Sequence, residues 1–182
     1  MKALLIIDIQ NDYFPGGRAE QVNPLAALAR AEELLGHFRE NRLPVIHVQH
    51  INVREGAAFF RPDTEGVKIH ERLAPRAGEH LVVKNFPNSF FKTSLDDIIR
   101  DRHISELVIC GMMTHMCVDT TVRAAKDRDL PVTLISDACA TKALEFEGVP
   151  VTAAQVQAAY MAALAGMFAR VATASEFIRE PF

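Results

Sequence analysis

Cys117 is the residue of this chain with the clearest capacity for chemistry. It lies in the run GMMTHMCVDTTVRAA, residues 111–125, after an apolar strand-like run and a glycine turn. Apolar side chains follow it at helical spacing, so the sequence predicts a helix that begins at Cys117. Unpaired backbone N–H groups and the positive end of a helix dipole favour a thiolate there. The alternative is a buried cysteine that only fills the core.

Two charged residues end predicted strands. Asp8 ends the run LLIID, which is followed by the turn signature Pro15-Gly16-Gly17, and Lys84 ends HLVVK ahead of the loop NFPNSFF. Ligands of α/β sheets usually bind at the carboxyl ends of the strands. Taken singly, Asp8 could cap a turn and Lys84 could lie in solvent. The shared placement of acid, amine and thiol predicts one site at this edge.

The elements that must position these residues alternate between strand and helix patterns. Predicted strands cover residues 2–8, 43–49, 80–84, 106–110, 131–136 and 171–174. Predicted helices cover 24–41 after the cap Asn23, a short segment after Thr93 or Ser94, 117–128 and 152–170. This alternation favours an α/β fold, a three-layer α/β/α sandwich with a mostly parallel, Rossmann-like sheet. The irregular segment 50–78 exceeds the usual loop length, which indicates a functional role or an oligomer contact.

Length and composition agree with one compact enzyme domain spanning residues 1–182. Hydrophobic residues make up 49% and charged residues 24% of the chain, as in ordinary soluble proteins. A net charge of −3 gives no case for binding nucleic acid or an anionic membrane. The first apolar run is too short for a signal peptide or a membrane span. Three cysteines without framework spacing favour a reducing compartment, and we expect a cytoplasmic protein.

The chain resembles the isochorismatase-like cysteine hydrolase superfamily, which includes nicotinamidases and N-carbamoylsarcosine amidases. The matching pieces are LLIIDIQNDYFPGG, VVKNFPNSFFKTSLD, ICGMMTHMCVDTTVRAA and LISDACAT, in the family's order between residues 4 and 141. The resemblance implies a catalytic triad of Asp8, Lys84 and Cys117, and a cis peptide bond between Met112 and Met113. True isochorismatases have a different residue in place of Cys117, which disfavours cleavage of a vinyl ether and leaves a C–N hydrolase.

The chemistry of these residue types fits hydrolysis of an amide or N-carbamoyl group in a small molecule. Asp8 would accept the Cys117 proton and later activate water, while Lys84 would hold Asp8 and favour the thiolate. Attack forms an oxyanion that needs aimed donors, and the backbone N–H groups of Met113 and Cys117 are the candidates. Loss of the amine would leave a thioester on Cys117.

Residues that could contact the substrate are less clear from the pattern. Aromatic side chains in predicted loops would suit a flat or apolar substrate, but they could equally anchor loops or form a subunit interface. The candidates are Tyr13, Phe14, Phe59, Phe60, Phe90, Phe91 and His115.

No metal and no other cofactor are expected. His47 and His50 look like a ligand pair, yet on a strand their side chains point to opposite faces. Nicotinamidases of the superfamily carry an Asp-x-His pair beyond the second strand, and here that region reads VQHINVREGAAFFRPD, without such a pair. This departure also puts nicotinamide in doubt as the substrate.

Self-association is expected. The predicted helix 152–170 is apolar on more than one face and so needs cover on two sides, and a monomer would struggle to bury Phe59 and Phe60. Members of the superfamily are commonly dimers or tetramers. We therefore expect a homodimer or homotetramer, unless the helix packs fully within one subunit.

Two other kinds of protein remain possible from the sequence. One is a redox protein in which Cys117 is oxidised, although no CxxC is present and Cys110 lies seven residues away on a predicted strand. The other is a binding or scaffold protein that keeps the fold without turnover, which the joint presence of Asp8, Lys84 and Cys117 disfavours.

Overall fold

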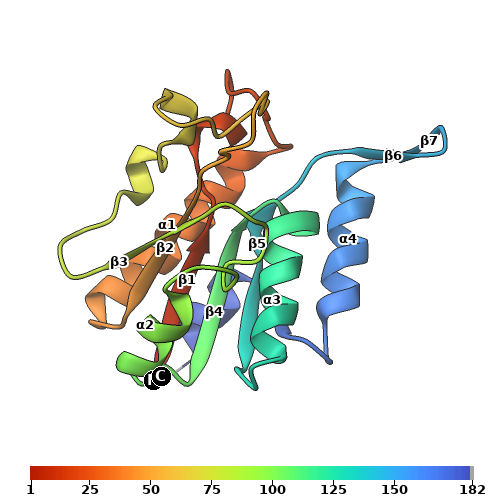
Figure 1. Cartoon of the computed structure of the whole chain (residues 1–182). Coiled ribbons are helices and arrows are strands. Elements are labelled where there is room, and N and C mark those ends of the chain that lie inside the picture. Colours follow the sequence, from red (N-terminus) through yellow and green to blue (C-terminus); the bar gives the residue numbers. More distant parts are fainter. Residues whose placement is uncertain (181–182) are drawn as a thin grey trace.

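One sheet of six strands organises the molecule (Figure 1). The computed structural model describes residues 1–180. The strands are β1 (Lys2–Ile7), β2 (Val45–His50), β3 (His80–Lys84), β4 (Glu106–Met112), β5 (Val132–Ala140) and β8 (Arg170–Ala172). They lie in the order β3-β2-β1-β4-β5-β8, and every pairing is parallel. The predicted parallel sheet is confirmed.

Helices cover both faces of this sheet. Those on one face are α1 (Pro24–Glu40) and α5 (Ala174–Arg179), and those on the other are α2 (Leu95–Asp101), α3 (Asp119–Lys126) and α4 (Ala153–Leu164). Because side chains alternate along a strand, Leu4 of β1 packs with the first pair and Leu5 with the second group. The apolar run at the start of the chain is therefore buried on both faces, and the three-layer α/β/α class is confirmed. Among residues 1–180, no helix combines the length and apolarity that crossing a bilayer requires.

The C-terminal part differs from the prediction. The helix predicted over 152–170 ends at Leu164, because Ala165 is extended and Gly166 takes a left-handed conformation with φ of 83°. The chain then turns into β8, so the last strand begins one residue earlier than predicted and is shorter. Helix α5 was not predicted, although Thr173 and Glu176 form a capping box, which is a sequence signal for the start of a helix.

A small antiparallel arm was also missed. It consists of β6 (Leu144–Phe146) and β7 (Val149–Val151) and extends away from the sheet beside the start of α4 (Figure 1). Both residues of its turn, Glu147 and Gly148, have positive φ, as a two-residue hairpin turn requires. The segment 50–78 contains two short 3-10 helices, Glu65–Val67 and Glu71–Leu73, and is hydrogen-bonded to the residues that follow β1.

The sheet order changes direction at β1 and β4. The chain leaves these neighbouring strands toward opposite sides, which is the place where α/β sheets bind ligands. Gly111 near the end of β4 has φ of 138°, and a Cβ there would overlap the Ile7 carbonyl oxygen. Glycine thus lets the ends of β1 and β4 approach closely. Asp8 follows β1, and the turn that carries Cys117 follows β4.

Candidate active site

Asp8, Lys84 and Cys117 meet at this switch point. The Lys84 Nζ atom lies 2.7 Å from Asp8 Oδ2 and 3.2 Å from Cys117 Sγ. The Asp8 and Lys84 side chains are wholly buried, and Cys117 is 4% exposed. An ammonium between a carboxylate and a thiol can hold both in one geometry and stabilise negative charge on either.

The backbone at these residues is unusual. Asp8 has φ of 51°, the left-handed region that a non-glycine residue occupies only when its surroundings enforce it. The Met112–Met113 peptide bond is cis. Cys117 lies in a π-helical turn, Thr114–Val118 (η4), in which the Val118 N–H donates to the Met113 carbonyl oxygen at 3.3 Å. Helical structure thus starts three residues before the predicted start at Cys117.

Charge in the cluster is balanced between Asp8 and Lys84. Burial lowers the pKa of Lys84, but the charges of Asp8 and Cys117 outweigh it, so the net pKa is raised and the ammonium persists. Burial and the Asp8 charge raise the pKa of the Cys117 thiol far above its ordinary value, against the opposing effect of Lys84. The expectation of a thiolate favoured by the helix is therefore wrong for the resting site, which holds a thiol.

His50 is a fourth member of the cluster. Its Nδ1 atom lies 3.0 Å from Lys84 Nζ, 3.9 Å from Asp8 Oδ2 and 4.0 Å from Cys117 Sγ. Burial and then the Lys84 charge lower the pKa of His50 to about 4, so the ring is neutral. The sequence reasoning considered His50 only as a metal ligand. Its position at the end of β2, matching Lys84 at the end of β3, was the signal that could have found it.

A metal ion does not fit this arrangement. Candidate ligand atoms of Asp8, His50 and Cys117 lie within 4.8 Å of one another. Lys84 Nζ, however, is 2.7 to 3.2 Å from each of them, so a cation of the protein already neutralises them. His47 faces elsewhere, as expected for its place on the strand, with Nε2 2.8 Å from Glu79 Oε2.

Of the candidate substrate contacts, Tyr13 and Phe60 lie against this cluster. Burial, followed by the charges of Cys117 and Asp8, raises the pKa of the Tyr13 hydroxyl. The Phe60 ring lies 4.6 Å from Tyr13 and 5.9 Å from His50 between centroids, and Phe59 packs on it at 5.0 Å. Phe60 is wholly buried within the single chain. The expectation that a monomer would struggle to bury it is wrong.

The remaining candidates make their ring or hydrogen-bond contacts with other residues. Phe14 packs on His70, Phe90 lies under the Arg128 guanidinium, Phe91 is 46% exposed beside Phe86, and His115 Nδ1 lies 2.6 Å from Thr141 Oγ1. Of the expected aromatic contacts, only Tyr13, Phe59 and Phe60 therefore lie near the cluster, and they pack on one another there.

Two buried polar residues, Gln10 and Asp12, join the segment 50–78 to the residues around the site. Neither was predicted from the sequence. Gln10 accepts from the His50 N–H at 2.8 Å and donates to the carbonyl oxygens of His50 and Val67 at 2.9 and 2.6 Å. Asp12 accepts from the Phe60 N–H at 2.6 Å. Asp8, Gln10 and Asp12 are every second residue of one short run. Asp8 pairs with Lys84 in the cluster, while Gln10 and Asp12 hold the segment 50–78 in place.

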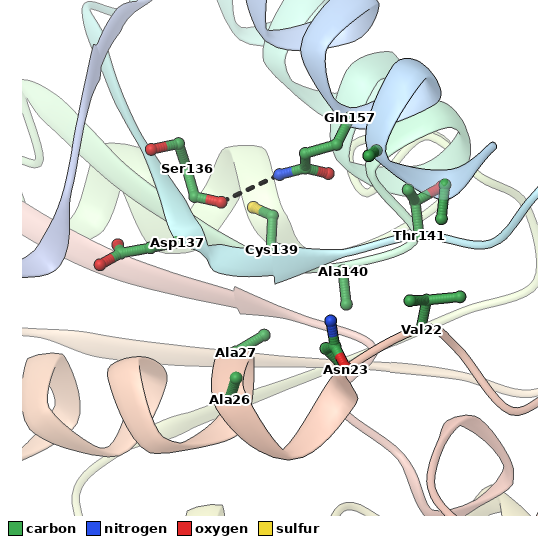
Figure 2. A pocket seen from close by; sticks show the side chains of 12 residues that line it. Val22, Asn23, Ala26, Ala27, Ser136, Asp137, Cys139, Ala140, Thr141 and Gln157 are labelled. Atoms are coloured by element: carbon green, nitrogen blue, oxygen red, sulfur yellow. Dashed lines mark hydrogen bonds between the residues drawn. The ribbon is translucent and has the colours of Figure 1, made fainter.

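A separate cavity of about 280 Å³ lies between α1, the end of β5 and α4 (Figure 2). It opens between the N-terminal ends of α1 and α4. Gln157 donates to the Ser136 carbonyl oxygen at 2.9 Å in this cavity and accepts from the Thr114 hydroxyl at 2.7 Å. None of Asp8, His50, Lys84 and Cys117 lines it. The cavity adjoins the same π-helical turn from outside the cluster.

Comparisons with known proteins agree with this geometry. The model of the isochorismatase domain matches residues 2–176. An uncharacterised isochorismatase family protein of Bacillus subtilis is 49% identical over 97% of this chain and 98% of its own length. A streptothricin hydrolase of Streptomyces noursei is 33% identical over 78% of this chain and 55% of its own length. The crystal structure of an isochorismatase hydrolase from Oleispira antarctica superposes with a TM-score of 0.95 at 46% identity, covering 98% of this chain and 96% of that one. The chain therefore belongs to the isochorismatase family and is a hydrolase.

Proposed function

We propose that this hydrolase cleaves the C–N bond of a small amide or N-carbamoyl compound through a thioester on Cys117. The observation that carries the proposal is the Lys84 ammonium, which lies 2.7 Å from the Asp8 carboxylate and 3.2 Å from the Cys117 sulfur. A buried thiol needs a nearby base before it can attack. Asp8 is that base, and Lys84 compensates the charge that moves from the carboxylate to the sulfur.

The first half of the reaction transfers the acyl group. Asp8 takes the thiol proton as the sulfur attacks the carbonyl carbon, and the N–H groups of Met113 and Cys117 donate to the oxyanion. The Met113 N–H donates to no other backbone group among the described residues, which supports this role. When the C–N bond breaks, the proton held by Asp8 goes to the leaving nitrogen. Ammonia or an amine departs, and Asp8 is again a carboxylate.

The second half hydrolyses the thioester. Asp8 accepts a proton from water, and the resulting hydroxide adds to the carbonyl carbon. The C–S bond then breaks, the proton returns from Asp8 to the Cys117 sulfur, and the acid leaves. The balance is one water consumed for each amide cleaved, with no redox change and no cofactor. Cys110 packs in the α1 layer and Cys117 in the α3 layer, an arrangement that gives a redox cycle between these two thiols no support.

A panel of primary amides and N-carbamoyl compounds, assayed for ammonia release, tests the proposal. We expect at least one compound to release ammonia with the native protein and not with Cys117→Ala. Mass spectrometry of a rapidly quenched reaction should find the acyl adduct on the peptide that contains Cys117. Equal ammonia release by native protein and variant would reject the nucleophile. Binding of panel compounds without any turnover would instead favour a scaffold role.

A further inference from the structure

Lys84 has more acceptors than it has protons to donate. Its Nζ atom lies near Asp8 Oδ2, His50 Nδ1, the Phe86 carbonyl oxygen and Cys117 Sγ at 2.7, 3.0, 3.1 and 3.2 Å. An ammonium carries three hydrogens and accepts none. His50 can therefore meet Lys84 only as an acceptor, through the lone pair on Nδ1.

This contact fixes the tautomer of His50. Because Nδ1 accepts from Lys84, the neutral ring carries its proton on Nε2. Protonation of Nδ1 would place a second cation beside the ammonium, which agrees with the pKa of about 4. Within the described residues Nε2 has no hydrogen-bond partner, and it is not one of the buried polar atoms left without one. Nε2–H is therefore a donor that solvent can reach.

The ring cannot easily turn away. Gln10 holds the backbone of His50 through both its N–H and its carbonyl oxygen, and the Phe60 ring packs beside the imidazole. The His50 side chain is 14% exposed, whereas those of Asp8 and Lys84 are wholly buried. His50 thus forms the accessible side of the cluster, next to Cys117.

From this geometry we propose that His50 is a substrate-binding residue whose Nε2–H donates a hydrogen bond to an acceptor atom of the amide or N-carbamoyl substrate beside the scissile bond. Lys84 sets the tautomer that makes this donation possible. The inference rests on the proposed function, because it assumes that the substrate approaches Cys117. It assigns His50 a role that involves no metal and no proton transfer, since a neutral imidazole is too weak an acid to protonate a leaving group.

Two replacements separate donation to substrate from support of Lys84. The amide of His50→Asn reaches the position of Nδ1 and leaves that of Nε2 empty. The longer His50→Gln places its amide at the position of Nε2. Cys117 is then alkylated with iodoacetamide, which carries an amide acceptor, and with iodoethane, which carries none, and the second-order rates are measured by mass spectrometry. Because both reagents alkylate the same sulfur, a change in the general reactivity of the thiol cancels in the ratio of the two rates.

We expect the ratio of iodoacetamide to iodoethane rates to stay within about threefold of native in His50→Gln. In His50→Asn it should fall by about tenfold, the scale of one hydrogen bond. His103→Asn, an exposed control, should leave the ratio unchanged. An unchanged ratio in both His50 variants, or a loss confined to His50→Gln, would overturn the donor role while leaving Cys117 as nucleophile. Failure of both reagents to alkylate native Cys117 would overturn the proposed function and the role of His50 with it.

Discussion

The Lys84 ammonium lies 2.7 Å from the Asp8 carboxylate, and neither side chain reaches solvent. A buried charge without its partner is costly, so each of these residues requires the other. The pair also explains why Cys117 rests as a thiol, because the Asp8 charge and burial disfavour a second anion in the same space. In the proposed mechanism, activation of the sulfur therefore coincides with transfer of its proton to Asp8.

The first prediction concerns Cys117 itself. Cys117→Ala and Cys117→Ser should abolish turnover of any substrate found in the amide panel, because the proposed reaction proceeds by covalent attack of sulfur. The fold should persist, since both replacements are small and the residue packs at the edge of the core. Ammonia release and circular dichroism check the two halves of this expectation. Residual turnover in the Ala variant that exceeds the uncatalysed rate would exclude the thioester route.

The second prediction concerns the charged pair. Asp8→Asn removes the proposed proton acceptor, and Lys84→Ala removes the cation proposed to compensate its charge. Each should lower kcat by at least about a hundredfold, the low end for general acid–base catalysis. Each should also destabilise the fold by about 3–5 kcal/mol, because a buried charge loses its partner. Kinetics must therefore be measured below the unfolding transition of each variant.

A double variant provides the control for stability. Asp8→Asn combined with Lys84→Met removes both charges, and it should recover part of the free energy of unfolding lost by Asp8→Asn alone. Activity should not recover. An Asp8→Asn protein with the native rate and the native pH profile would show that the proton acceptor is another group.

Much of this site was predictable because the ends of buried strands can be located from the sequence pattern. The apolar run before Asp8 and the one before Lys84 each locate a carboxyl strand end, and parallel pairing brings such ends together. His50 was not found, because the second strand was predicted to stop at residue 49 and histidine has no single role at a strand end. The role of Gln10 was not predicted for a different reason. Its contacts join residues 40 and 57 positions apart, and such pairings leave no local pattern.

The missed parts of the fold have similar causes. The alanine-rich run after Thr152 has high helix propensity throughout, and only Gly166 marks where the helix must end. The arm formed by β6 and β7 has two strands of three residues each, too short for an alternation signal. Pro150 also counts against a strand, and it is tolerated because the arm has free edges.

The third prediction concerns stability at acid pH. His50 has a pKa of about 4 in the folded chain and an ordinary value of 6.5 when unfolded. Between these values the unfolded chain binds the extra proton, so the free energy of unfolding falls as the pH drops from 6.5 to 4. The contribution of His50 over this window is at most about 3 kcal/mol.

Urea unfolding at pH 7 and pH 4 measures this effect. His50→Gln cannot titrate, so it should lose less stability than the native protein between the two pH values. Because burial also lowers the pKa of His47, the variant isolates His50 from a second group of the same sign. If both proteins lose the same free energy of unfolding, the imidazole is not held neutral by its surroundings.

The fourth prediction is that chelation leaves activity unchanged. Lys84 occupies the space among the three candidate ligands, and a metal ion would have to displace its ammonium. Overnight dialysis against EDTA should leave kcat on a panel substrate within error of the untreated enzyme. Loss of activity that added zinc or manganese restores would show that Lys84 moves aside for an ion.

The last prediction is assembly, which we propose occurs between copies of this chain. Helix α4 buries Val156, Met161 and Leu164 against the sheet and leaves an opposite row of alanines exposed, among them Ala158 and Ala162. The adjoining arm exposes 71% of Phe146 and 61% of Val149, and Figure 1 shows β6 and β7 extending away from the sheet. Exposed apolar side chains on α4 and on the arm suit a second copy with closed symmetry, because the alanines allow close approach and the arm supplies a large side chain.

Sedimentation equilibrium at micromolar concentration tests this assembly. The native protein should have at least twice the chain mass of 20.2 kDa. Phe146→Glu places a charge in the proposed contact and should shift the distribution toward the monomer, whereas Phe146→Leu should retain the native mass. A single native species near 20.2 kDa would show that α4 and the arm face solvent. An unchanged oligomeric mass in Phe146→Glu would show that the contact lies on another face of the molecule.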